Sequence, residues 1–439
     1  MNILLVLFGK LLSTISRFFN LGSGSTWPGH LALLINKNFI KDLLKNSKIK
    51  VILVTGTNGK TTTGKLIQTV LEKSGKKVFQ NASGANLLNG IASSLLLHSS
   101  ILDKINYDYA IFEIDENILP FILKEITPDY LILLNLFRDQ LDRYGEVNTI
   151  TKKWQKALSK LSKNTTLILN ADDPQIASLR RHLEGVNIKF FGIDSKNNTE
   201  KTQHASDSIY CPNCGEKLTY ISTYFSHLGD WICKKCHNKH PQETFTSSPF
   251  YPLSGVYNQY NTNAAVLLAQ ALGFDKEKIT ASLKGFKPAF GRQEILDIEG
   301  KKAQIFLSKN PTSFNESLRT IASLNAKTIL IVLNDRIPDG RDVSWIWDVE
   351  FENYVDSFEH IIISGERCYD MALRIKYANS LKNQKIAIGQ FNNLTIEDDL
   401  RKTIKISLSK IDTKQTLYIL PTYSAMLEVR KILTNKKIL

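Results

Sequence analysis

The chain has 439 residues, 43% of them hydrophobic and 22% charged, which is the composition of a soluble globular protein with two or three domains. Its 56 Lys and Arg residues against 42 Asp and Glu give a net charge of +14, which favours polyanions such as nucleic acid, anionic lipid or phosphorylated substrates without selecting one. Five cysteines in a chain of this length exclude a disulfide framework and are typical of the reducing cytoplasm.

Residues 1–45 begin with an apolar run that Lys10 and Arg17 interrupt. The run is too short to cross a bilayer, and it lacks the basic start and the cleavage site of a signal peptide. We therefore expect an N-terminal docking segment, whose helix packs on the protein or lies on the inner face of the plasma membrane.

Residues 46–288 alternate short apolar runs with helical patterns, as in a parallel sheet that is buried on both faces. The predicted strands are Val51–Val54, Tyr109–Ile114, Leu131–Leu134, Leu167–Leu169 and Ile188–Phe191. Polar residues follow most of them at once, at the edge where an open parallel sheet binds ligands. They are Thr55-Gly56, Asp115-Glu116, Asn135 and Asn170.

Residues 289–439 contain a second series of such runs and predict another α/β domain of Rossmann-like type. Its predicted strands are Ile305–Leu307, Ile329–Leu333, Ile361–Ile363, Lys385–Ile388 and Leu417–Leu420.

The segment 51–63, VILVTGTNGKTTT, consists of a buried strand, a glycine turn and a helix start, and it predicts a phosphate-binding loop. Lys60 would neutralise the β- and γ-phosphate oxygens, and Thr61 would hold Mg²⁺. Val54 stands where the general motif has its first glycine. A chance Gly-Lys-Thr turn is the alternative. The predicted ATP-binding residues here are Gly56, Thr57, Asn58, Gly59, Lys60, Thr61 and Thr62.

Two C-x-x-C pairs, Cys211–Cys214 and Cys233–Cys236, stand 18 residues apart and predict a closed Cys₄ zinc ribbon inserted at about 205–245. A redox pair is the alternative. We expect Cys368 to be buried and inert. Since four thiolates fill the zinc shell, we expect three nearby histidines on the surface: His227, His237 and His240.

The loop Gly-Thr-Asn-Gly-Lys-Thr-Thr resembles that of the Mur ligase and folylpolyglutamate synthetase superfamily. Glu113, in Glu-Ile-Asp-Glu, looks like the superfamily's magnesium-binding glutamate, with a solvated acidic turn as the alternative. The segment 135–145 is similar to its Asp-His-x-Asp segment, with Gln140 in place of the metal-binding histidine. The resemblance thus implies Thr61, Glu113 and Gln140 around Mg²⁺. The superfamily's carbamylated lysine has no clear counterpart here.

The segment 255–265 resembles the superfamily's adenine-binding segment, with Tyr257 in the place of a histidine. This resemblance implies that Asn258 and Asn261 bind ATP, although helix capping is the alternative for such an Asn-rich helix start. Arg292 resembles a linker arginine that reaches the ATP phosphates; an exposed surface arginine is the alternative.

The zinc ribbon and the short N-terminal segment depart from most Mur ligases and resemble the MurT family, the Mur ligase-like subunits of lipid II isoglutaminyl synthase. The likeness covers nearly the whole chain. It implies that ATP phosphorylates the α-carboxylate of D-Glu in the lipid II stem peptide, and that ammonia from a GatD-like glutaminase subunit converts the acyl phosphate to D-isoglutamine. The implied cofactors are ATP, Mg²⁺ and Zn²⁺, with Lys60 and Glu113 as catalytic residues.

The same resemblance implies that Asp342, in Asp-Gly-Arg-Asp, completes the partner's Cys–His pair as a third catalytic residue. A turn residue that pairs with Arg336 or Arg341 is the alternative. Two rival functions remain open. One is a Mur or folylpolyglutamate-type amino acid ligase, and the other is a nucleic-acid-binding zinc-ribbon ATPase. We expect no nucleic acid, because no Arg/Lys stripe is interleaved with aromatic residues.

Overall fold

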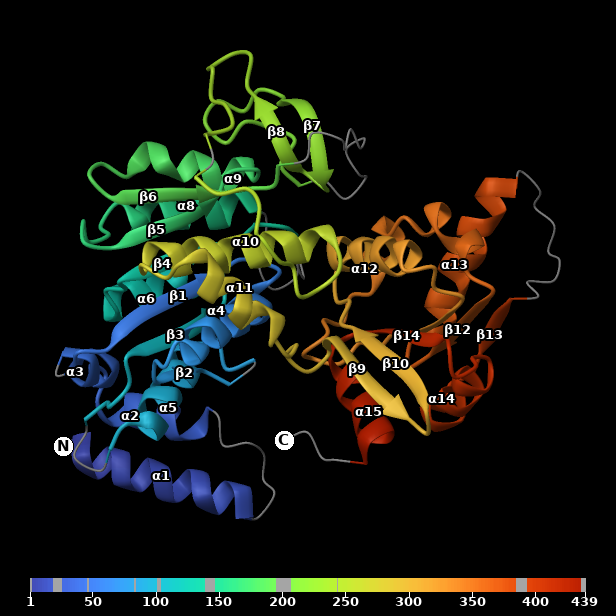
Figure 1. The fold of residues 1–439 in the computed structure, drawn as a ribbon, viewed down its shortest axis with the longest axis horizontal. Helices are drawn as coiled ribbons and strands as arrows, with labels where there is room; N and C mark the ends of the chain where they lie inside the picture. The colour runs from blue at the N-terminus through green and yellow to red at the C-terminus, as the bar shows by residue number, and fades with distance from the viewer. Residues whose placement is uncertain are drawn as a thin grey trace.

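The computed structural model contains two α/β domains side by side and a small hairpin that projects from the first of them (Figure 1). It describes residues 2–18, 26–45, 47–82, 84–100, 104–138, 147–194, 207–242, 244–383 and 393–435. The mixed α/β class predicted from the sequence is confirmed.

The first domain has a six-stranded parallel sheet with the order β2-β3-β1-β4-β5-β6. The predicted apolar runs between residues 51 and 191 correspond to five of these strands, and the short β2 was not predicted. The strands are β1 (Lys50–Thr55), β2 (Val78–Gln80), β3 (Tyr109–Ile114), β4 (Tyr130–Leu133), β5 (Thr166–Asn170) and β6 (Asn187–Phe191).

Successive residues of β1 enter two different cores, because side chains alternate between the faces of a strand. Leu53 packs in the core on one face, whereas Ile52 and Val54 pack in the core on the other. Both faces are therefore covered by helices, and the strands are apolar throughout. The first face carries α2 (Trp27–Ile35), α3 (Phe39–Lys45), α5 (Leu88–His98), α6 (Leu119–Glu125) and α8 (Val147–Leu158); the second carries α4 (Lys60–Lys73), α10 (Val256–Ala271) and α11 (Lys276–Lys284).

The N-terminal helix α1 (Asn2–Phe18) lies outside α2 and α5 as an extra layer (Figure 1). It buries Leu5 and Val6, and Gly9 permits close packing, since a Cβ there would lie 2.5 Å from a Leu96 methyl carbon. The structure thus shows a helix that packs on the protein, which is one of the two placements expected of this segment. Within the described residues, no helix combines the length and the apolar character needed to cross a membrane.

The inserted segment forms an antiparallel hairpin, β7 (Thr219–Phe225) and β8 (Leu228–Ile232), at the top of the first domain in Figure 1. One C-x-x-C pair precedes the hairpin and the other follows it. The short helix α9 (Pro174–Ser178) and the 3-10 turn η1 (Leu179–His182) lead from β5 toward β6.

The second domain has a six-stranded sheet with the order β13-β12-β11-β14-β10-β9, in which only the β9–β10 pair is antiparallel among the described strands. The predicted strand Lys385–Ile388 lies outside the described residues. The strands are β9 (Arg292–Ile298), β10 (Lys301–Phe306), β11 (Thr328–Val332), β12 (His360–Ser364), β13 (Leu394–Ile396) and β14 (Thr416–Pro421).

Helices cover both faces of this second sheet as well. One face carries α12 (Pro311–Ser323), α13 (Cys368–Asn383) and the 3-10 turns η2 (Ser344–Asp348), η3 (Phe351–Asn353) and η4 (Val355–Ser357). The other face carries α14 (Leu400–Ser409) and α15 (Tyr423–Thr434). Cys368 begins α13 and is buried in the first of these cores, as predicted.

Candidate active site

The glycine loop begins where the central strand β1 ends and leads directly into α4. Gly56 and Gly59 have φ angles of 141° and 91°, a region that side chains rarely adopt. Space also requires glycine, because a Cβ on Gly59 would lie 2.0 Å from the Asn261 Oδ1 atom. The loop thus meets α10, on which Asn261 stands, at van der Waals distance.

Asn135, just after β4, fixes the shape of this loop. Its Oδ1 accepts the backbone N–H of Asn58 at 2.9 Å, and its Nδ2 donates to the Asn58 carbonyl at 3.1 Å. Its own carbonyl accepts the Thr57 N–H at 3.0 Å. The sequence placed Asn135 at the sheet edge without indicating this role.

Lys60 lies in the loop with 9% of its surface exposed. Its ammonium donates to the Gly56 carbonyl, to the Thr57 carbonyl at 3.2 Å, and to the Glu116 carboxylate at 3.1 Å. Glu116 is itself buried, so the two charges offset each other. The sequence placed Glu116 among the polar residues that follow the predicted strands, but it did not indicate the pairing with Lys60.

Thr61 and Glu113 meet beside Lys60. The Thr61 hydroxyl donates to the Glu113 carboxylate at 2.7 Å. The Asn81 side chain holds Glu113 in place, because it accepts the Glu113 N–H at 2.8 Å and donates to the Glu113 carbonyl at 2.9 Å. A hydroxyl and a carboxylate suit Mg²⁺, which prefers oxygen ligands. Glu113 is buried, so the solvated acidic turn is wrong, and Gln140 lies outside the described residues.

Asn258 and Asn261 stand one turn apart on α10. The Asn261 amide donates to the Asn258 Oδ1 at 3.2 Å, and the Asn258 amide donates to the Ser254 carbonyl at 2.7 Å. Beside them, the Tyr257 hydroxyl accepts a hydrogen bond from Gln293 at 2.7 Å, and burial raises the pKa of Tyr257 to about 12. Gln293, which no sequence pattern indicated, therefore ties α10 to β9.

Arg292 lies where the two domains meet and lines two adjoining cavities. One cavity contains Lys60 and Glu113, and the other contains Asn258 and Asn261. Burial lowers the pKa of Arg292, and the nearby Glu113 carboxylate opposes that shift. The alternative of an exposed surface arginine is therefore wrong.

The cleft above the glycine loop has a volume of about 450 Å³ and takes its walls from both domains. The second domain contributes Lys309, Pro338 and Tyr423. Asn310, which caps α12, donates to the Asn58 side chain at 3.3 Å. The predicted loop residues Thr57 to Thr61 are thus brought together with Glu113 and Arg292 around one cleft. Thr62, Asn258 and Asn261 line the cavity beside it, and Gly56 lines neither.

The four paired cysteines converge at the base of the hairpin, with their sulfur atoms within 4.8 Å of one another. The Sγ atoms of Cys211 and Cys236 are 3.6 Å apart, and those of Cys214 and Cys233 are 3.5 Å apart. A Zn–S bond of about 2.3 Å in a tetrahedron requires sulfur atoms about 3.8 Å apart. The cluster therefore fits a closed Zn²⁺ site.

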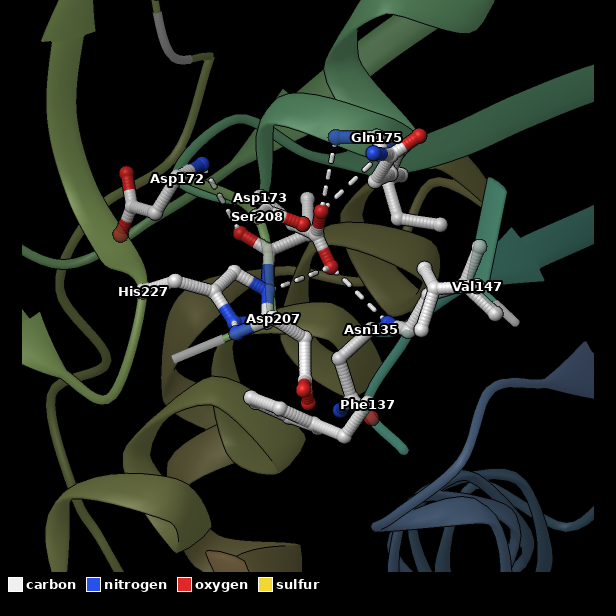
Figure 2. Close-up of polar contacts among 12 residues, drawn as sticks. Asn135, Phe137, Val147, Asp172, Asp173, Gln175, Asp207, Ser208 and His227 are labelled. Atoms are coloured by element: carbon white, nitrogen blue, oxygen red, sulfur yellow. Dashed lines mark hydrogen bonds and ion pairs between the residues drawn. The ribbon is translucent and has the colours of Figure 1, made fainter. Parts of the chain in front are cut away.

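The expected surface position of the ribbon histidines is wrong for two of the three. His227 lies beside Asp173 (Figure 2). It is fully buried, and its Nε2 is 3.7 Å from the Asp173 Oδ2. The His240 Nε2 lies 2.7 Å from the Asp172 carboxylate. Only His237 of these three is exposed. His227 and His240 therefore pack the ribbon against the first domain. The spacing of the cysteines alone does not indicate this packing.

Asp342 lies apart from this cleft, on the exposed surface of the second domain. Its carboxylate accepts the Ser344 N–H at 2.8 Å, and this hydrogen bond lowers the pKa of Asp342. The suggested pairing with Arg336 is wrong, since that guanidinium binds Glu366 and Glu428. Asp342 borders an open groove of about 310 Å³ that also contains Trp347.

Comparison with known families accounts for most of the chain. The Mur ligase middle domain matches residues 54–269, and the MurT ligase C-terminal family matches residues 307–426. The lipid II isoglutaminyl synthase (glutamine-hydrolyzing) subunit MurT of Streptococcus pneumoniae is 33% identical, over 95% of this chain and 94% of that protein. The subunit of the same name from Staphylococcus aureus is 32% identical, over 81% of this chain and 83% of that protein.

Solved structures share the fold at lower identity. A pseudomurein peptide ligase type C from Methanothermus fervidus superposes with a TM-score of 0.64 and 23% identity, over 90% of this chain and 80% of that one. MurF ligase from Thermotoga maritima, in complex with ADP, superposes with a TM-score of 0.60 and 14% identity, over 91% of this chain and 82% of that one. The Mur ligase fold predicted from the sequence is confirmed.

We predict that Lys60→Ala lowers ATP turnover at least about a hundredfold, because the variant lacks the cation closest to the loop backbone. Lys65→Ala, on the same helix but outside the cleft, is the matched control and should keep full turnover. Steady-state ATP hydrolysis in the complete complex measures both. Since Glu116 loses its partner, thermal unfolding must show that Lys60→Ala is folded. A folded Lys60→Ala variant with normal turnover would contradict the assignment.

Proposed function

Because this chain belongs to the MurT family of Mur ligase-like subunits, we propose that it is the ligase subunit that amidates the peptide of lipid II at the expense of ATP. The substrate carboxylate is the α-carboxylate of D-Glu, and the product is D-isoglutamine. One observation carries the proposal: the glycine loop, the Thr61–Glu113 pair and Arg292 surround a single cleft between two domains.

The reaction has two steps. A carboxylate oxygen attacks the γ-phosphorus of ATP, the bond to the β-phosphate oxygen breaks, and ADP leaves an acyl phosphate. Ammonia then attacks the carbonyl carbon, the C–O bond to phosphate breaks, and the nitrogen loses a proton. Lys60 and Arg292 offset the negative charge that shifts onto the departing oxygens in the first step. The cleft walls position the carboxylate and limit access of water.

Thr61 and Glu113 are the described residues that would hold Mg²⁺, and the metal would neutralise phosphate charge there. The Glu116 carboxylate holds the Lys60 ammonium at the loop, within reach of the phosphate oxygens. Asp115 also lies in the cleft lining. Gln140, the third predicted Mg²⁺ ligand, lies outside the described residues.

The test of this function is reconstitution of the purified chain with a glutaminase subunit, ATP, glutamine and lipid II. The product should differ from lipid II by the mass of an acid-to-amide change, about one dalton. Omission of ATP or of glutamine should abolish the change. Addition of an amino acid instead of ammonia would show that the chain acts as an amino acid ligase, and the proposed reaction would be wrong.

We propose that the partner, a GatD-like glutaminase, binds the surface around Asp342. Exposed apolar side chains gather there on η2 and α13, which is typical of protein interfaces. The Trp347 and Tyr377 rings are 5.6 Å apart, and Arg374 lies 5.6 Å from the Trp347 ring. Tyr369 and Leu373 are exposed on the same helix.

The loop that carries Asp342 also reaches the ATP cleft, because Ile337 and Pro338 line that cleft. Asp339 lies between Pro338 and Asp342 in this loop, and its carboxylate accepts the Ser424 N–H at 2.8 Å. A partner at Asp342 would therefore stand beside the ligase site. The Ser344 N–H lowers the pKa of Asp342 and so favours the carboxylate, which is the form that orients a partner's histidine.

We predict that Asp342→Asn loses glutamine-dependent amidation by about 10³–10⁴-fold but regains activity with concentrated free ammonia, since an orienting carboxylate serves only the Cys–His chemistry. Asp412→Asn is the control and should keep glutamine-dependent turnover, because this exposed aspartate of the second domain also accepts the N–H two residues on, at 2.8 Å, and lies outside the proposed partner surface. Complex formation is checked by gel filtration. Equal inactivity of Asp342→Asn with glutamine and with ammonia would place the residue in the ligase reaction or in folding.

We further propose that α1 and α2 rest on the cytoplasmic face of the membrane that holds lipid II. Their outer surface is apolar and exposed, at Ile3, Leu4, Leu7, Phe8 and Leu11 of α1 and at Trp27, Leu34 and Ile35 of α2. Residues 1–50 carry six lysines and one arginine against a single aspartate. An apolar helix face with basic surroundings is typical of helices that bind anionic bilayers.

We predict that the double variant Leu4→Glu, Phe8→Glu binds vesicles of phosphatidylcholine and phosphatidylglycerol about tenfold or more weakly, because charge would enter the bilayer boundary. Ile221→Glu, at an exposed position on the ribbon, is the control and should bind as the unchanged chain does. Cosedimentation measures both. If the double variant cosediments as well as the unchanged chain, this surface does not face the membrane.

A further inference from the structure

The tip of the ribbon hairpin enters the site beside the ATP cleft. Phe225, the last residue of β7, is 3% exposed and lines the cavity that also contains Asn258, Asn261 and Arg292. Phe306 and Leu307 of the second domain line the same cavity. The family resemblance did not predict a ribbon residue in the nucleotide site, because the adenine-binding segment that it implies lies at 255–265.

Packing fixes the position of the Phe225 ring. Its centroid lies 5.3 Å from that of Phe137 and 6.5 Å from that of Tyr260. Phe137 follows β4, on the segment that also fixes the glycine loop through Asn135. The hairpin turn needs Ser226 at a φ of 52°, which places Phe225 and Leu228 opposite each other. The tip is thus part of the core of the first domain.

Buried polar contacts attach the rest of the hairpin to the same domain. Figure 2 shows His227 between Asp173 and Asp207, and its ring centroid lies 4.7 Å from that of Phe137. Further along, the Trp231 indole N–H donates to the Ala171 carbonyl at 3.2 Å. These contacts run from the cavity toward the cysteine cluster, because Cys233 follows β8 directly.

We propose that the ribbon is part of the nucleotide-binding site, in which Phe225 supplies an apolar wall for the purine base and a metal at the four cysteines holds that wall in place. The inference rests on the proposed ATP site. It adds Phe225 as a contact of the base, and it makes binding of the base depend on the metal at the four cysteines. The cavity has amides at Asn258 and Asn261 for the edge of a base, and Phe225 gives it an aromatic side chain for the apolar surface. The phosphate-binding loop requires neither these amides nor the aromatic ring to bind phosphate groups.

The base contact can be separated from the phosphate contacts by comparison of two ligands, ATP and inorganic triphosphate, each with Mg²⁺. Loss of an aromatic wall weakens binding of a base about tenfold. We therefore expect Phe225→Ala in the full chain to raise the Kd for ATP about tenfold and to leave the Kd for triphosphate unchanged. Titration calorimetry measures both constants.

Phe39→Ala is the matched control, because Phe39 is a buried phenylalanine of the first domain that packs in the core on the other face of the sheet, outside the cavity and the ribbon. It should leave the Kd for ATP unchanged. Phe225→Leu, which keeps the apolar volume, should fall between the unchanged chain and Phe225→Ala. An unchanged Kd for ATP in Phe225→Ala, or an equal loss for ATP and triphosphate, overturns the proposal.

The dependence on the metal is tested by Cys236→Ser and by treatment of the unchanged chain with a zinc chelator, with the metal content measured by mass spectrometry. Both should raise the Kd for ATP about as much as Phe225→Ala does and spare triphosphate. A metal-depleted chain that binds ATP with unchanged Kd overturns this dependence. Failure of the unchanged chain to bind ATP or triphosphate at all would instead contradict the proposed ATP site.

Discussion

The contact between Gly59 and Asn261 is the constraint on which the site depends. These residues are far apart in the sequence, and a Cβ on Gly59 would lie 2.0 Å from the asparagine oxygen. The glycine loop and α10 can therefore approach only because residue 59 has no side chain. This approach brings the phosphate-side and base-side parts of the cleft together, and α10 in turn packs against α4, α12 and β7 of the ribbon.

Charge is balanced within the cleft. Lys60 binds Glu116, and Thr61 donates to Glu113, so the described structure holds its cation and its anions close together before any substrate enters. Arg292 adds a second positive charge from the domain boundary, where burial lowers its pKa. A polyphosphate would enter a site whose positive groups are already positioned, which is the condition for electrostatic stabilisation of a transition state.

The fold and the glycine loop could be predicted because their signals are local. Continuous apolar runs such as Tyr109–Ile114 indicate strands covered on both faces, and Cys spacing indicates a metal site. Other features depend on contacts between distant segments. His227 is buried because the ribbon packs on Asp173, and Gln293 matters because β9 lies beside Tyr257. No spacing within a segment encodes such contacts. The position of Phe225 at the cavity could not be predicted from the sequence for the same reason.

Transfer of oxygen from the substrate to phosphate tests the central claim most directly. Lipid II would be labelled with ¹⁸O in both oxygens of the D-Glu α-carboxylate, and the phosphate released during amidation would be analysed by mass spectrometry. An acyl phosphate intermediate predicts one ¹⁸O atom in each phosphate and one in each amide. Phosphate without the label, formed along with amidated product, would contradict activation of the carboxylate by ATP.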